Sequence, residues 1–242
     1  MLFRSETLRV GDFGSLDDPK NYNNSPGSIT AGIAAGLFFQ PDRMEPEQIG
    51  TLAGELMAMT HGSPEAFLSG VVLAYTIAGI LQEPDCDLQD QFAQAISVME
   101  GQFGNRFEEA EELARQLRRV MDLARSGTVG PQEGLEQLDC LDAPQCLAGA
   151  IFACLVNPDD FDAAIITAVN HSGMSAAVGA MAGAIMGAGM GESALPEFYL
   201  ESLECAHVLE VLATDMARGK PGMGLFDDSW DHKYEQGLPP EN

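Results

Sequence analysis

Basic residues are scarce in this chain of 242 residues. It has 12 Lys and Arg against 37 Asp and Glu, which leaves a formal net charge of −25 at pH 7. A surface this acidic repels phosphate backbones and the anionic face of a membrane, so we expect neither nucleic acid nor a membrane as a partner. The charge favours solubility and does not by itself define a function.

Two further signals are missing. The N-terminal stretch "MLFRSETLRVGDFGSLDD" has no apolar core and no small-residue cleavage site of a signal peptide, so we expect a cytoplasmic protein. The cysteines form no Cys-x-x-Cys pair, which gives little support to a zinc site. We interpret all five as buried free thiols. They are Cys86, Cys140, Cys146, Cys154 and Cys205.

Helical periodicity begins near residue 28. Residues 1–27 are rich in turn formers, as in "DDPKNYNNSPGS", and are predicted to be a loop-rich lead-in. From there on, apolar residues recur at three- and four-residue spacing, first in "SITAGIAAGLFFQ", "EPEQIGTLAGELMAMTH" and "SPEAFLSGVVLAYTIAGILQ". Pro46 and Pro64 suit first turns of helices, and Ser63 is the expected N-cap.

The middle of the chain is predicted to be an exposed amphipathic helix. Its apolar stripe comprises Phe107, Ala110, Leu113, Leu117, Val120 and Met121. Glu111 and Arg115 have the favourable i,i+4 order for an ion pair. Very few segments alternate like strands, so the prediction is an all-α, compact bundle of about ten helices in a single domain, 1–219. Residues 220–242 are predicted to be an irregular tail that docks through Phe226 and Trp230.

Glycine recurs every four residues in "NHSGMSAAVGAMAGAIMGAGMG", at Gly179, Gly183, Gly187 and Gly191. Because Gly costs about 1 kcal/mol against Ala in a helix, the repetition needs a packing reason. We interpret this segment as a central helix that its neighbours cross tightly. A membrane span is the alternative, since small residues four apart serve helix pairs in lipid. It is disfavoured because the run is short and rich in Gly and Ala instead of Leu and Ile.

Four segments carry a family resemblance. In order, "NNSPGS", "MTHGSPEAFLSG", "NPDDFDAAIITAVNHSG" and "GAMAGAIMGAGMGESALPEFYLESLE" resemble the ADP-ribosylglycohydrolase family of the dinitrogenase-reductase-activating type. The similarity runs from about Asn23 to Arg218. It implies a compact helical bundle that holds two magnesium or manganese ions and hydrolyses the glycosidic bond between ADP-ribose and a protein side chain. It also implies ADP-ribose or an ADP-ribosylated protein as the partner.

The metal-ligand positions of that family are altered here. These hard cations need oxygen ligands. Where the family has an Asp-x-Asp-x-Thr segment, this chain has Met174, Ala176 and Val178. A thioether and two hydrocarbon side chains cannot hold magnesium, so we expect no metal. We interpret the three replacements as suited to a dry, packed interior.

The other family motifs are expected to be missing as well. The similarity begins too close to the N-terminus for the family's upstream Gly-Asp and Thr-Asp-Asp motifs. The segments "VGDFG" (10–14) and "LDD" (16–18) lie too near each other, in a turn-rich loop, to replace them. Ala31 and Gly32 occupy the region of a family Arg.

Three groups of residues match family ligand contacts. By resemblance, His61 lies near the bound ADP-ribose, although a lone His at a helix end more often caps or packs. Asn24, Gly27 and Ser28 match a loop beside the ribose and phosphate. Taken alone, they indicate an ordinary turn.

Asn170, Ser172 and Gly173 match the loop before the lost carboxylates. Taken alone, they indicate a helix end followed by an N-cap. His171 and Ser172 are adjacent, but adjacency is not the geometry of a catalytic triad. Asp159 and Asp160 follow a proline, where capping the next helix is expected to outweigh acid–base work.

Two functions therefore stay open, and the catalytic residues are unknown. The first is an ADP-ribosylglycohydrolase impaired by loss of its carboxylates. The second is a non-catalytic homologue that binds ADP-ribose or a protein partner.

Overall fold

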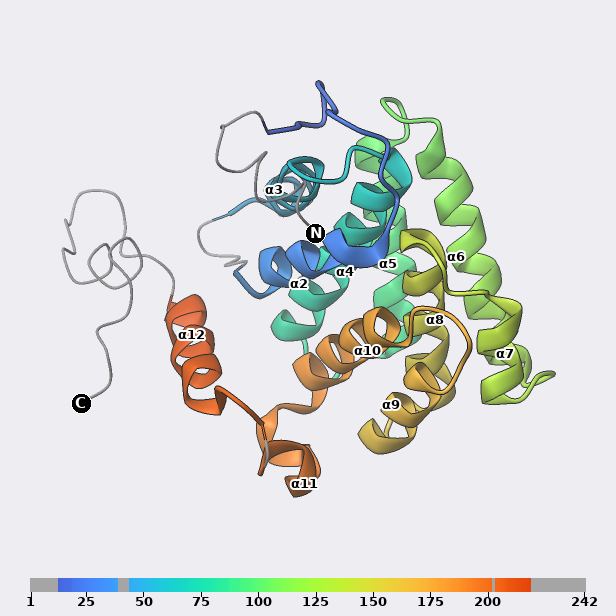
Figure 1. The fold of residues 1–242 in the computed structure, drawn as a ribbon, viewed down its shortest axis with the longest axis vertical. Coiled ribbons are helices and arrows are strands. Elements are labelled where there is room, and N and C mark those ends of the chain that lie inside the picture. The colour runs from blue at the N-terminus through green and yellow to red at the C-terminus, as the bar shows by residue number, and fades with distance from the viewer. Residues whose placement is uncertain (1–12, 39–43, 202, 219–242) are drawn as a thin grey trace. The chain divides into compact units, whose positions relative to one another are not determined.

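The structure, a computed structural model, describes residues 13–38, 44–201 and 203–218 (Figure 1). These residues form eleven α-helices, two short 3-10 helices and no strand, which confirms the predicted all-α fold. In chain order the elements are η1 (Pro26–Ser28), α2 (Ile29–Phe38), α3 (Pro46–Ala58), α4 (Pro64–Gln82), α5 (Leu88–Phe103), α6 (Glu109–Ser126), α7 (Pro131–Gln137), α8 (Ala143–Val156), α9 (Phe161–Val169), α10 (Ser175–Met190), η2 (Glu192–Ala194), α11 (Glu197–Leu200) and α12 (Ala206–Arg218).

The central helix is α4. Fourteen of its 19 residues are buried, and it packs against α2, α3, α5, α6, α8 and α10. The approach to α2 is close, because a Cβ on Gly32 would lie 2.5 Å from the carbonyl oxygen of Gly70. Within the described residues, α4 alone has the length and hydropathy of a membrane span, and 78% of that stretch is buried inside the bundle. Core helices of bundles meet the same criteria.

The glycine-rich α10 is not the central helix, which corrects the interpretation from its sequence. Its buried face comprises Val178, Met181, Ala182, Ile185 and Met186.

The glycines of α10 lie beside that buried face. A Cβ on Gly179 would lie 2.7 Å from Val169 of α9, whereas one on Gly187 would meet nothing within 4 Å. Four residues turn a helix by about 40° more than one revolution. The glycine row therefore rotates away from α9 toward open space along the helix.

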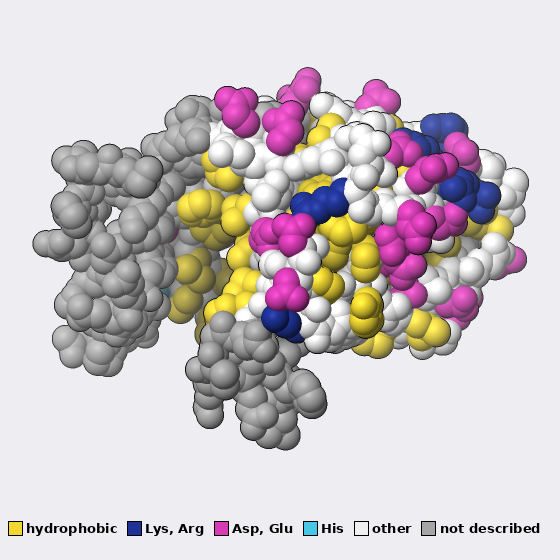
Figure 2. Space-filling view, turned by 90° about the horizontal axis from the view of Figure 1, so that it is seen from above, with side chains coloured by type: hydrophobic (Ala, Val, Ile, Leu, Met, Phe, Trp, Pro, Cys, Tyr) yellow, Lys and Arg dark blue, Asp and Glu magenta, His cyan; other side chains and the backbone are white. Residues whose placement is uncertain are grey.

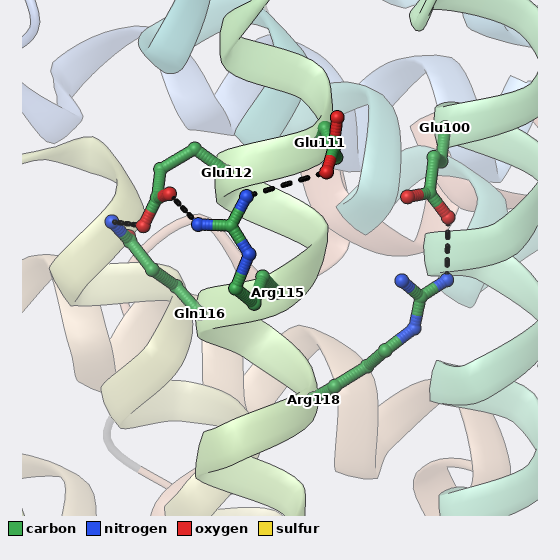
Figure 3. A network of polar contacts seen from close by, with 6 residues as sticks. All are labelled: Glu100, Glu111, Glu112, Arg115, Gln116 and Arg118. Carbon is green, nitrogen blue, oxygen red and sulfur yellow. Dashed lines mark hydrogen bonds and ion pairs between the residues drawn. The ribbon is translucent and has the colours of Figure 1, made fainter.

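The predicted stripe on α6 is confirmed for five of its six residues, and the charged side chains lie opposite it, whereas Phe107 lies before the helix and is half-buried. Buried residues of α6 are Ala110, Leu113, Ala114, Leu117, Val120 and Met121. Figure 3 shows the polar face, where Arg115 pairs with Glu111 at 3.4 Å and also with Glu112. Arg118 reaches Glu100 of α5 at 2.6 Å. Exposed pairs of this kind contribute at most about 1 kcal/mol each, so apolar burial is what holds α6 in place.

Acidic side chains outnumber basic ones on the face of the molecule shown in Figure 2. In the face shown in Figure 2, acidic side chains lie among apolar ones and basic side chains are few. Of the cysteines, Cys140, Cys146 and Cys154 are buried as predicted. Cys86 is half-buried and Cys205 is exposed, so the prediction of a buried thiol was wrong for Cys205.

The chain divides into two compact units, Met1–Ser202 and Leu203–Asn242. The second contains α12, whose side chains Leu209 and Leu212 are exposed. The assignment of residues 1–219 to one domain stays a prediction. The tail 220–242, with Phe226 and Trp230, lies outside the described residues.

Candidate functional site

His61 lies between α3 and α4 and contacts the loop that leads into η1. Its side chain is fully buried. Ser25 Oγ lies 3.0 Å from His61 Nε2, and Thr60 Oγ1 lies 2.9 Å from Nδ1. Both ring nitrogens are therefore engaged by hydroxyl groups. The loop is fixed by Asn21, whose amide donates to the carbonyl of Thr60 at 3.1 Å.

Ser28 is the polar residue of η1 that faces inward. It is 5% exposed, and its Oγ is the one buried side-chain oxygen or nitrogen without a hydrogen-bond partner among the described residues. An unpaired buried hydroxyl costs about 1–3 kcal/mol. Asn24 and Gly27 are exposed. The carbonyl oxygen of Asn24 accepts a hydrogen bond from the N–H of Ala143 at 2.9 Å, which ties η1 to the start of α8.

The second group of predicted residues forms the turn between α9 and α10. Asn170 donates its side-chain amide to the carbonyl of Ile166 at 2.7 Å. Ser172 donates its N–H and its hydroxyl to the carboxylate of Glu136 on α7, at 3.0 and 2.5 Å. His171 Nδ1 accepts from the N–H of Gly173 at 3.1 Å, and Nε2 lies 3.0 Å from the carbonyl oxygen of Ala168. Through these contacts His171 holds the turn.

Gly173 is required by a close backbone approach. A Cβ there would lie 2.3 Å from the carbonyl oxygen of Asp139 and 2.7 Å from that of Cys140. Asp139 and Cys140 both have left-handed backbones, with φ of 57° and 53°. That conformation costs roughly 1–2 kcal/mol in a residue other than glycine. It aims the Cys140 carbonyl at the N–H of Met174, 2.8 Å away.

The Cys140 thiol beside this turn is not activated. Burial, followed by the charges of Asp139 and Glu136, raises the pKa of Cys140 to about 12. Nucleophilic cysteines have lowered pKa values. The buried Cys140 side chain is part of the packed core.

One short segment, residues 139–143, joins the two groups. Its Cys140 end holds the turn of Gly173 and Met174, and its Ala143 end holds Asn24. The structure therefore brings the residues expected from the resemblance to the two ends of this segment. Their assignment to ligand binding stays a prediction.

The metal-ligand positions lie at the start of α10. Met174 is 47% exposed, Ala176 is exposed and Val178 is fully buried. The interpretation that all three suit a dry interior is wrong for Met174 and Ala176. Met174 is the N-cap of α10 and Ala176 stands in its first turn, and only the side chain at 178 turns toward the core.

Among the residues that the structure describes, no group of carboxylates replaces these positions. Across the described ranges, no three His, Cys, Asp or Glu side chains are grouped to hold a metal ion. Asp17 forms an ion pair with Arg106 at 2.5 Å, and Asp18 one with Lys20 at 2.7 Å. The donors of the described part of the chain therefore do not fit two magnesium or manganese ions. Gly32, in the region of the family Arg, packs on Gly70.

Of the two acids before α9, only one acts as a cap. Asp160 accepts from the N–H of Ala163 at 2.9 Å, which confirms its capping role, whereas Asp159 caps nothing. Sequence reasoning missed a group of carboxylates at the start of α4. The pKa of Glu65 is raised first by desolvation and then by the charges of Asp142 and Glu109.

Sequence reasoning also missed the polar partners of the predicted residues. Ser25, Thr60 and Glu136 hold His61 and Ser172 in place. Only Thr60 gave a signal, since it is the neighbour of His61. Ser25 and Glu136 each lie 36 residues from the residue they contact.

The helices and polar turns described above form an all-α bundle of the ADP-ribosylglycohydrolase type. A family model described as ADP-ribosylglycohydrolase matches residues 6–224, and the chain belongs to this family. The match begins before Asn23, so it includes the segments 10–14 and 16–18. No curated protein sequence matches the chain.

Proposed function

We propose that this chain is a member of the ADP-ribosylglycohydrolase family that does not hydrolyse ADP-ribose conjugates. The observation that carries the proposal is the start of α10. There Met174, Ala176 and Val178 offer no oxygen donor, and the described part of the chain groups no other carboxylates in their place. A metal-activated water needs such donors, since they hold the ion that lowers the pKa of water.

Binding of ADP-ribose or an ADP-ribosylated protein is the second candidate. The unpaired hydroxyl of Ser28, beside the exposed Asn24 and Gly27, favours it. A ligand hydroxyl or phosphate oxygen that reached Ser28 would satisfy a group that now lacks a partner. The charges of Glu65 and Asp142 oppose a pyrophosphate, so we expect weak binding.

The first test is an assay for release of ADP-ribose from arginine-modified protein, with magnesium and with manganese. An active hydrolase of the family is the positive control. We expect no release above the protein-free rate. Metal-dependent release would overturn the proposal, because it would require oxygen ligands that the described residues do not supply.

The second test is titration calorimetry with ADP-ribose. The variant Ser28→Ala removes the unpaired hydroxyl, and Ser97→Ala on α5 is the matched control. If Ser28 contacts the ligand, binding weakens only in Ser28→Ala, while its melting temperature stays equal or rises. Equal affinity in both variants would remove Ser28 from the site.

A further inference from the structure

A groove runs past the C-terminal end of α10, far from the positions of the lost ligands. It consists of two adjoining hollows of about 370 and 310 Å³ that share Asp159 and Met190, and we call it the acidic groove. Because α10 has 16 residues, this end lies roughly 24 Å from Met174. Apolar side chains that line the groove include Cys86, Leu88, Phe161, Ile185, Met186 and Met190.

The floor of the groove is formed by flexible methionine side chains and has room for an apolar side chain of a partner. Met186 and Met190 contribute thioethers, which adapt to partners of different shape. Gly189 also lines the groove, and a Cβ there would meet only Ile80, at an ordinary contact distance of 3.5 Å. The backbone is therefore open to a partner at this point.

Carboxylates of Asp85, Asp159, Asp160 and Asp162 form the rim. Asp160 caps α9, and Asp162 accepts a hydrogen bond from the hydroxyl of Tyr199 at 2.7 Å. Neither Asp85 nor Asp159 has an ion pair with a described residue.

Basic residues are missing from the sequence around this rim. No Lys or Arg occurs between Arg43 and Arg106, or between Arg125 and Arg218. No Lys or Arg of residues 44–105 or 126–217 therefore neutralises the negative charge of the rim. A rim of this charge is complementary to a cationic partner.

We propose that the acidic groove binds a basic peptide segment of a partner protein. One bulky apolar side chain of the segment lies on the methionine floor, and flanking Lys or Arg side chains pair with Asp85 and Asp159. The apolar contact positions the bound segment, and the charges of the rim attract it to the groove. This inference does not depend on the loss of hydrolysis at the other end of α10.

The test uses the full chain and a short labelled peptide with one Trp between Lys and Arg residues, followed by fluorescence anisotropy. A peptide with Ser in place of Trp tests the apolar contact, and a peptide with Glu in place of Lys and Arg tests the charge. We expect binding of the first peptide alone, weakening as salt rises. Spermine, a polycation without an apolar side chain, should compete poorly. No binding of the first peptide, or equal binding of the Ser peptide, would overturn the proposal.

Two variant pairs locate the site. The double variant Asp85→Asn, Asp159→Asn should weaken peptide binding roughly five- to tenfold. The control Glu47→Gln, Glu108→Gln removes the same charge elsewhere on the surface and should change binding less than about twofold.

Gly189→Leu should fill the groove and abolish binding. Gly187→Leu, where a Cβ meets nothing within 4 Å, is its control. Both leucines should keep or raise the melting temperature, because Gly is a poor helix former. If the two members of either pair changed peptide affinity equally, the acidic groove would not be the binding site.

Discussion

Returning carboxylates to the start of α10 should leave the protein folded and inactive. In the double variant Met174→Asp, Ala176→Asp, the loss of a half-exposed Met costs about 1 kcal/mol. Residue 174 is the N-cap of α10 and gives it no side-chain hydrogen bond. An Asp there contributes about 0.5–2 kcal/mol, and an acid at 176 about 0.3–1 kcal/mol more through the helix dipole. Repulsion from Glu136 and Asp139 offsets part of this gain.

The net change in the free energy of unfolding should therefore be within about 1 kcal/mol of zero. For a chain of this size, that shifts the melting temperature by no more than roughly 2–4 °C. The matched control is Val178→Asp, which buries a charge at a fully buried position. It should cost more than about 4 kcal/mol and lower the melting temperature by roughly 10 °C or more.

The assays are thermal unfolding followed by circular dichroism, with and without manganese, and release of ADP-ribose from modified arginine. We expect near-normal melting, no stabilisation by manganese and no hydrolysis in the double variant. If it melted as low as Val178→Asp, the placement of Met174 and Ala176 on the surface would be wrong. Measurable hydrolysis would show that further oxygen ligands exist in this chain.

Two further variants test the local physics of the site. Gly173→Ala forces a Cβ against two backbone carbonyls, so it should destabilise by about 1–3 kcal/mol in urea unfolding, while Gly101→Ala, with open space, should stabilise by about 1 kcal/mol. Equal unfolding midpoints would mean that Gly173 is not held by packing. Glu65 has a raised pKa, so its charged form is disfavoured in the folded state. Its contribution to stability is complete below its ordinary pKa of 4.5 and is lost as the pH rises through the raised value. Glu65→Gln should therefore raise the melting temperature at pH 7, with a gain that narrows as the pH falls toward 4.5. Glu47→Gln, at the same first-turn position in α3, should show no gain, and a gain at pH 7 that did not narrow would exclude the charge of Glu65 as its cause.

Local signals in the sequence predicted most of the helices. Pro46 and Pro64 mark the first residues of α3 and α4, because proline fits where no intrahelical N–H bond is needed. The stripe on α6 was visible because only one face of that helix is buried. The position of α10 beside the central helix could not be predicted from its sequence. Small residues allow close packing on any side, and the packing of α4 with its six neighbours decides which helix is central.

The candidate site was predictable only in part. Capping by Asp160 follows from its position before α9. The contact of His61 with Ser25 and the hydrogen bond of Ser172 to Glu136 each join residues that lie 36 positions apart in the sequence. A local sequence pattern cannot predict contacts over that separation. The left-handed pair Asp139 and Cys140 was also hidden, since neither is a glycine. Tertiary contacts override the local preference there.

The acidic groove lies in a part of the chain that has no primary amine. The sequence contains three lysines, Lys20, Lys220 and Lys233, and none between residues 21 and 219. Amine-reactive dyes, cross-linkers and sensor surfaces will therefore attach outside every helix described here. A protein immobilised in this way keeps the side chains of the groove unmodified. Trypsin, which cuts after Lys and Arg, has no cleavage site from residue 126 to 217, so α7 to α12 should be released as one acidic fragment.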